Sequence, residues 1–179
     1  MVISGLPGSG KSTLSKELAN VLGWKRHSVG GYWRAKFKEE HPNGDVTFEE
    51  FWKGTSLEDN ARADRELKGI AAEGNVVIDC RFTHKMDPYA SLLVFLEATA
   101  DVRAERLRKL GTYGDKTANE IKDILKARQE DELNMAKRLY GEDYDFRMPI
   151  NYHVCINTGT LSVEQEIDIV LTFMQMDRR

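Results

Sequence analysis

Residues 5–12 read Gly-Leu-Pro-Gly-Ser-Gly-Lys-Ser, which fits the pattern G-x-x-x-x-G-K-[ST] of a phosphate-binding loop. Glycine adopts backbone angles that other residues avoid, so this stretch lets successive N–H groups point inward at an anion. Lys11 supplies a positive charge for the outer phosphates of a nucleotide, and the Ser12 hydroxyl can ligate Mg²⁺. The sequence therefore predicts a site for nucleotide phosphates at this loop.

The residues around the loop indicate where it lies in the fold. Before it, residues 2–4 predict a short buried strand. After it, apolar residues recur at helical spacing, namely Leu14, Leu18, Val21 and Leu22, and Gly23 follows as a C-cap. The loop should therefore lie between a strand and a helix N-terminus, where the helix dipole favours phosphate.

The composition is that of one ordinary globular domain. The chain has 179 residues, of which 41% are hydrophobic and 31% are charged, enough for a sizeable core. The net charge of −3 gives no electrostatic reason to expect nucleic acid or an anionic membrane surface as a partner.

Other features of the sequence bear on where the protein works. No apolar run approaches the roughly 18 residues of a membrane span, and the N-terminus lacks the features of a secretory signal. Cys80 and Cys155 lie in apolar, strand-like runs, which predicts buried, reduced thiols. We therefore expect a cytoplasmic protein that acts as a monomer on a small-molecule substrate, with no nucleic acid and no membrane as partner.

Strand-like and helical segments alternate along the chain. The expected strands are Val2–Ser4, Arg26–Val29, Asn75–Asp79, Leu92–Leu96 and His153–Asn157. Capping boxes mark three helix starts: Thr47 with Glu50, Thr117 with Glu120, and Ser162 with Gln165. This order predicts an α/β fold of three layers, with a five-stranded parallel sheet between helices.

Two helical segments do not fit the plain alternation. Residues 30–73 are rich in charge and aromatic side chains, and residues 108–141 are strongly charged. The remaining core is then 1–29, 74–107 and 142–179. Either segment could be a surface insertion, but on a phosphate-loop core such segments more often cover substrates, and we expect them to do so here.

Charged residues follow two of the expected strands. Arg34, after the second strand, could grip a phosphate in a bidentate fork or could equally be a solvated helix arginine. Asp79 and Arg81 close the third strand, and ligands of open α/β sheets bind outside the carboxyl ends of the strands. Asp79 is then placed to hold Mg²⁺ through water, and Arg81 to meet an acceptor phosphate.

Further arginines follow the fourth expected strand: Arg103, Arg106, Arg108 and Arg128. They fit lid arginines that close on both substrates, and they equally fit the salt-bridged face of a surface helix. The four histidines show no metal-ligand spacing with the cysteines, although His84 follows Arg81 in the same loop.

In this order, the motifs resemble those of nucleoside monophosphate kinases, closest to the short cytidylate kinases of archaea. The resemblance covers nearly the whole chain. It rests on the residues 5–12, Ser28-x-Gly30-x-x-x-Arg34, 77–81, 102–106, Arg128, Tyr140-Gly141 and 156–158.

The resemblance implies a role for each matching residue. ATP would be bound by Gly5, Gly8, Ser9, Gly10, Lys11, Ser12, Thr13, Arg103, Asn157 and Thr158, with Mg²⁺ at Ser12 and Asp79. The monophosphate would be bound by Ser28, Arg34, Asp64, Arg65, Arg81 and Glu132. The catalytic residues would be Lys11, Arg81, Arg106 and Arg128. Residues 30–73 become the monophosphate-binding insertion and 108–141 the lid.

Two positions of the expected lid helix depart from the family pattern. Met135 stands where a second phosphate arginine is expected, and Glu132 where Asp or Asn helps to select cytosine. An ionised carboxylate only accepts hydrogen bonds, so Glu132 should prefer an exocyclic amine to a carbonyl. We therefore expect CMP or dCMP as the preferred acceptor, AMP as a weaker one, and UMP and dTMP as poor ones.

Two other functions remain open from the sequence. A kinase of the same fold could phosphorylate a hydroxyl group of a small molecule. A nucleotide-binding switch could hydrolyse ATP slowly and signal by closing its covers. The arginines Arg34 and Arg81 favour an acceptor that already carries a phosphate.

Overall fold

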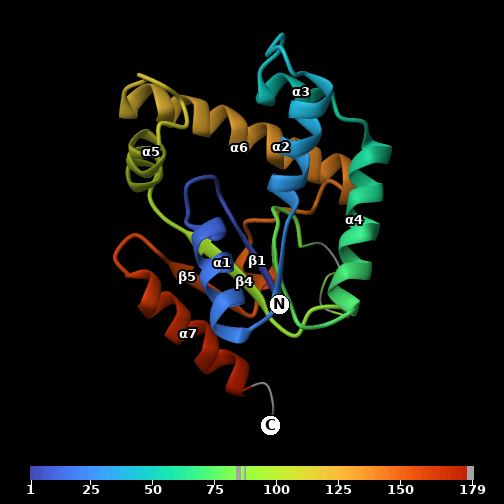
Figure 1. The fold of residues 1–179 in the computed structure, drawn as a ribbon, viewed down its shortest axis with the longest axis vertical. Coiled ribbons are helices and arrows are strands. Elements are labelled where there is room, and N and C mark those ends of the chain that lie inside the picture. Colours follow the sequence, from blue (N-terminus) through green and yellow to red (C-terminus); the bar gives the residue numbers. More distant parts are fainter. Residues whose placement is uncertain (84–85, 87, 177–179) are drawn as a thin grey trace.

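Five short parallel strands form the centre of the molecule in a computed structural model, which describes residues 1–83, 86 and 88–176 (Figure 1). They are β1 (Val2–Gly5), β2 (Lys25–Ser28), β3 (Val76–Asp79), β4 (Leu93–Glu97) and β5 (Val154–Asn157). Their order in the sheet is β2-β3-β1-β4-β5, and all pairs are parallel. The expected strands are confirmed, with each end within one residue of the observed one.

Helices cover both faces of this sheet because successive strand residues point to opposite sides. On one face, Ile3 and Val94 pack with α1 (Lys11–Leu22) and α7 (Val163–Met176). On the other, Val2 and Leu93 pack with α4 (Leu57–Ala72). Phe95 on that face meets the end of α6 (Ala118–Tyr140) and Phe146. The three-layer α/β/α fold is therefore confirmed.

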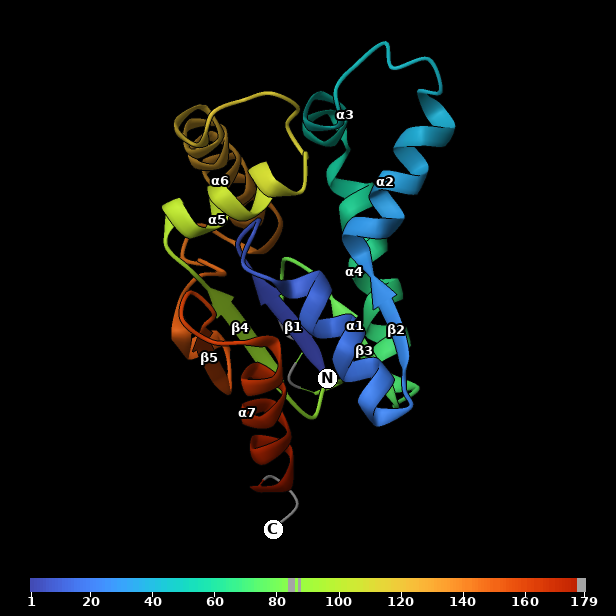
Figure 2. The same ribbon diagram turned by 60° about the vertical axis from the view of Figure 1, so that its left-hand side comes forward.

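The remaining helices lie beyond the carboxyl ends of the strands (Figure 2). One group follows β2 and consists of α2 (Val29–Glu40), α3 (Phe48–Gly54) and the start of α4. The other consists of α5 (Ala100–Lys109), which follows β4, and α6. A 3₁₀ turn at Pro149–Asn151 precedes β5. The three capping boxes are confirmed by reciprocal hydrogen bonds at their expected residues.

An ion pair links the two groups of helices. The Lys53 ammonium of α3 lies 2.9 Å from the Asp131 carboxylate of α6. Within the described residues, no helix has the length and apolar character needed to cross a membrane. Cys80 is buried as expected, but Cys155 is exposed on the edge strand β5, so the expectation of two buried thiols is wrong for Cys155.

Candidate active site

The loop between β1 and α1 has backbone geometry that requires glycine at two points. Gly5 has φ +147°, and a Cβ there would lie 2.2 Å from the Leu96 carbonyl oxygen. Gly8 has φ +80°, and a Cβ there would lie 2.8 Å from the Arg103 carbonyl oxygen. The loop is therefore pressed closely against its neighbours, which leaves the other side open to a ligand.

Lys11 supplies the positive charge of the loop. Its Nζ donates to the Leu6 carbonyl oxygen at 3.0 Å, so the side chain folds back over the loop. Burial lowers the pKa of Lys11 to about 8, although the nearby Asp79 opposes this shift. The ammonium is therefore mostly charged at neutral pH and can bind a phosphate group.

Two predicted ATP-binding residues brace the loop from behind. Arg103 is only 6% exposed and donates to the carbonyl oxygens of Ala98 (3.2 Å) and Pro7 (3.3 Å). The Thr158 hydroxyl donates to the Ser9 carbonyl oxygen at 2.9 Å. Arg106 grips Thr158 in turn, from Nη1 to Oγ1 at 2.9 Å and from Nη2 to the carbonyl oxygen at 2.7 Å. Arg103 and Thr158 therefore stabilise the conformation of the loop. Neither residue lines the cavity described below.

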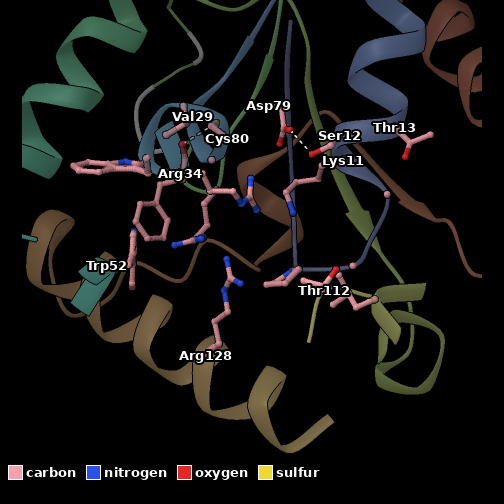
Figure 3. A pocket seen from close by; sticks show the side chains of 18 of the residues that line it. Lys11, Ser12, Thr13, Val29, Arg34, Trp52, Asp79, Cys80, Thr112 and Arg128 are labelled. Atoms are coloured by element: carbon pink, nitrogen blue, oxygen red, sulfur yellow. Dashed lines mark hydrogen bonds between the residues drawn. The ribbon is translucent and has the colours of Figure 1, made fainter. Parts of the chain in front are cut away.

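Asp79 lies where a metal site was expected. Pairing of β1 with β3 sets it beside Ile3, and the Ser12 hydroxyl donates to its Oδ2 at 2.8 Å (Figure 3). Arg26 (3.1 Å) and Ser28 (3.3 Å) donate to the same oxygen. Ser28 also caps α2 and faces Asp79 instead of the cavity. A carboxylate beside a hydroxyl is a donor pair that suits Mg²⁺.

A cavity of about 720 Å³ opens above the carboxyl ends of the strands, between the two groups of helices. Its walls include these predicted residues: Gly8, Gly10, Lys11, Ser12, Thr13, Arg34, Asp64, Asp79, Arg81, Arg106 and Arg128. Other predicted residues do not line it: Gly5, Ser9, Ser28, Arg65, Arg103, Glu132, Asn157 and Thr158. The sequence reasoning missed these lining residues: Trp33, Trp52, Asn60, Tyr113, Tyr140 and Glu166.

Arg81 and Arg128 approach the cavity from different elements and share one anion. The Glu132 Oε1 accepts a hydrogen bond from Arg128 Nε at 2.9 Å and forms an ion pair with Arg81, whose Nε lies 3.0 Å away. The guanidinium carbon of Arg81 lies over the Trp52 ring, 4.6 Å from the ring centre. Burial lowers the pKa of Arg81 to about 10 and Glu132 counteracts this, so the side chain is charged at neutral pH. Figure 3 shows Arg128 and Lys11 pointing to the centre of the cavity from opposite sides.

Glu132 itself is 0% exposed, and its Oε2 has no hydrogen-bond partner among the described residues. Glu132 therefore lies behind the two arginines and does not line the cavity. A direct contact with the base, as predicted for Glu132, stays a prediction. Met135, at the expected place of a second phosphate arginine, is 5% exposed and belongs to the core.

The insertion contributes a second carboxylate to the cavity. Asp64 on α4 accepts from Lys68 Nζ at 2.8 Å and is hydrogen-bonded to the phenol of Tyr140. Burial raises the pKa of Tyr140 above its usual range, and the neighbouring Asp64 carboxylate adds to this. Trp33 and Asn60 line the same part of the cavity. Asp64 therefore offers a fixed hydrogen-bond acceptor in apolar and aromatic surroundings.

Some predicted residues lie at the margin of the site. Arg34 lines the cavity but is exposed, with its guanidinium 5.7 Å from the centre of the Phe48 ring. Arg65 is exposed on α4, one position beyond Asp64 and off the cavity. Asn157 accepts from the Gly159 N–H at 2.9 Å within a turn. His84 lies outside the described residues.

Comparison with known proteins identifies relatives over most of the chain. A family model described as an AAA domain matches residues 1–131. A cytidylate kinase of Pyrococcus horikoshii is 35% identical over 175 residues, which cover 95% of this chain and 85% of that protein. A cytidylate kinase of Ignicoccus hospitalis is 32% identical over 174 residues, which cover 95% of each.

Solved structures share the fold at lower identity. A gluconokinase of Sinorhizobium meliloti superposes with a TM-score of 0.63 at 17% identity, over 98% of this chain and 90% of that one. A shikimate kinase of Bacteroides thetaiotaomicron superposes with a TM-score of 0.59 at 19% identity, over 97% of each. Together with the near full-length sequence matches, the phosphate loop and its arginine-lined cavity lead to one conclusion: the chain belongs to the cytidylate kinase family of P-loop kinases.

Proposed function

We propose that this enzyme transfers the γ-phosphoryl group of ATP to CMP or dCMP. The observation that carries the proposal is the set of cations that share one cavity with the phosphate loop: Lys11, Arg34, Arg81, Arg106 and Arg128. Two phosphorylated substrates bring several negative charges together, and their transfer reaction needs positive charge on both sides. Relatives named cytidylate kinase support the choice of acceptor.

The donor phosphates would lie on the loop, with Lys11 at the outer phosphates and Thr13 beside them. Ser12 and Asp79 would hold Mg²⁺, which neutralises the charge that develops on the transferred group. Residues 30–73 would form the acceptor-binding insertion, and 108–141 the lid.

The acceptor phosphate would be held by Arg34 and Arg81, with Arg128 reaching it from the lid. One of its oxygens attacks the γ-phosphorus while the bond to the β–γ bridging oxygen breaks, so that ADP leaves. The attacking oxygen is already anionic, and the chain has to supply position and charge more than a base.

Recognition of the base falls to the insertion. Asp64 is an acceptor-only group when ionised, so it can take the exocyclic amine of cytosine but has nothing to offer the carbonyl of uracil. Trp33 supplies an aromatic wall nearby. Glu132 would act through the arginines, by fixing Arg81 and Arg128 from behind.

A coupled assay of ADP release across monophosphates tests this function. We expect CMP and dCMP to be the best acceptors, AMP weaker, and UMP and dTMP at least about tenfold poorer in kcat/KM. A preference for UMP or dTMP would contradict the proposed recognition of cytosine but would still agree with a nucleoside monophosphate kinase. ADP release that no monophosphate accelerates would support the nucleotide switch instead.

We also expect the two covers to close together. Hydrogen exchange of residues 30–73 and 108–141 should slow when a bisubstrate analogue binds and change little with ATP alone, because closure needs contacts to both ligands. Mass spectrometry of the peptides measures this directly, with peptides of α7 as the internal control. Equal protection by ATP alone would remove the support for an acceptor in the cavity.

We further propose that the enzyme works in the cytoplasm as a monomer. The low net charge and the described free thiols of Cys80 and Cys155 support this setting. Elution at the position expected for about 20 kDa on a sizing column with light scattering would support the monomer, and a twofold mass would contradict it.

A further inference from the structure

Three carboxylates line the cavity, and one of them has no partner. Asp79 accepts from three side chains, and Asp64 accepts from Lys68. The side chain of Glu166, in the first turn of α7, forms no hydrogen bond or ion pair among the described residues, although the residue is only 4% exposed. A carboxylate that lines a cavity without a protein partner is available to a ligand.

The surroundings of Glu166 are mostly apolar. Leu161 and Val163, which precede Glu166 in the chain, line the same cavity. Arg106 is the charged side chain that interacts electrostatically with the Glu166 carboxylate. Burial raises the pKa of Glu166 to about 7, and the charge of Arg106 opposes the rise. Arg106 is already engaged with Thr158 through both of its terminal nitrogens. The carboxylate therefore keeps its capacity to accept hydrogen bonds.

The topology assigns this part of the cavity to the donor. The phosphate loop follows β1 in the middle of the sheet, and the acceptor insertion follows β2 at one edge. α5 and α7 follow β4 and β5, at the opposite side. A nucleotide whose phosphates lie on the loop, and whose outer phosphate faces Arg81, must extend its nucleoside toward α5 and α7.

We infer that Glu166 selects the donor base by accepting a hydrogen bond from the exocyclic amine of adenine. Guanine presents a carbonyl oxygen at the corresponding position, which an ionised carboxylate repels. A ligand that leaves a buried polar group of the site without a hydrogen-bond partner binds much more weakly than one that pairs with it. The inference deepens the proposed function, since it names a residue that sets which triphosphate the kinase uses.

Calorimetric binding of non-hydrolysable ATP and GTP analogues, with Mg²⁺ at pH 8, tests the inference without any turnover. For the unmodified enzyme we expect the ATP analogue to bind at least about tenfold more tightly than the GTP analogue. In Glu166→Gln the two affinities should come within about threefold, because the amide can donate to the guanine carbonyl. In Glu166→Leu, binding of the ATP analogue should weaken with no gain for the GTP analogue.

Glu164→Gln is the matched control, because Glu164 is an exposed acid on the same turn of α7. Its ATP-to-GTP affinity ratio should stay within twofold of that of the unmodified enzyme. An unchanged ratio in Glu166→Gln, or equal weakening of both analogues, would overturn the inference and leave Glu166 a structural residue. A failed acceptor screen would not touch this measurement, because the binding of the donor is observed alone.

Discussion

Lys11→Ala should lower the kcat of ATP-dependent phosphorylation by about a thousandfold or more, because charge stabilisation supplies most of the catalysis of phosphoryl transfer. Lys11 is the cation nearest to the loop that cradles the donor phosphates, and its charge is present at neutral pH. The fold should survive, since among the described residues the side chain makes a single hydrogen bond, to the Leu6 carbonyl oxygen.

The measurement compares turnover and thermal unfolding of the two proteins side by side. Lys16→Ala is the matched control, because Lys16 is an exposed lysine on the same helix α1. The control should keep its turnover within about twofold. A folded Lys11→Ala enzyme with near-normal turnover would show that the loop does not serve phosphoryl transfer.

Local patterns were sufficient to predict the sheet and the centre of the site. Short apolar runs bounded by turns predicted the strands, and the carboxyl ends of parallel strands meet at one edge of a sheet. For that reason Asp79 and Arg81 could be placed beside the loop from the sequence alone. The hydrogen bond between Ser12 and Asp79, residues 67 apart in the chain, follows from this rule.

Roles that depend on side-chain direction could not be predicted in the same way. Arg103 belongs to a motif, yet its guanidinium turns back to carbonyl groups of the chain, which no spacing reveals. Glu132 carries a local signal, the four-residue spacing to Arg128 that pairs charges along a helix. Its second partner, Arg81, follows the distant strand β3, so the burial of Glu132 behind both arginines emerged only in the fold.

Glu166 was missed for a different reason. An acidic residue in the first turn of a helix is explained by its favourable interaction with the helix dipole, so the sequence alone does not indicate a functional role. Only its burial and its place on the cavity wall set it apart from Glu164. The same limit applies to Cys155, whose apolar strand lies at an uncovered edge of the sheet.

Glu132→Gln should lower kcat/KM for the acceptor by about 10- to 100-fold, and by the same factor for CMP, dCMP and UMP. The carboxylate holds both arginines by their Nε atoms through one oxygen, which leaves the cavity side of each guanidinium for phosphate. An amide lacks the charge that offsets the repulsion between the two arginines. They should therefore lose their fixed positions whatever base the acceptor carries.

Kinetics with each monophosphate at saturating ATP separate this positioning role from base selection. If Glu132 touched the base, the gap between CMP and UMP would narrow in Glu132→Gln instead of staying constant. Asp131→Asn is the control on the neighbouring position, and it should cost less than about threefold, because the half-exposed pair with Lys53 contributes little. In Glu132→Gln, the affinity for an ATP analogue should also change far less than the affinity for CMP, since Arg81 binds the acceptor. An equal loss of affinity for the ATP analogue and for CMP would mean that Glu132 supports the cavity as a whole.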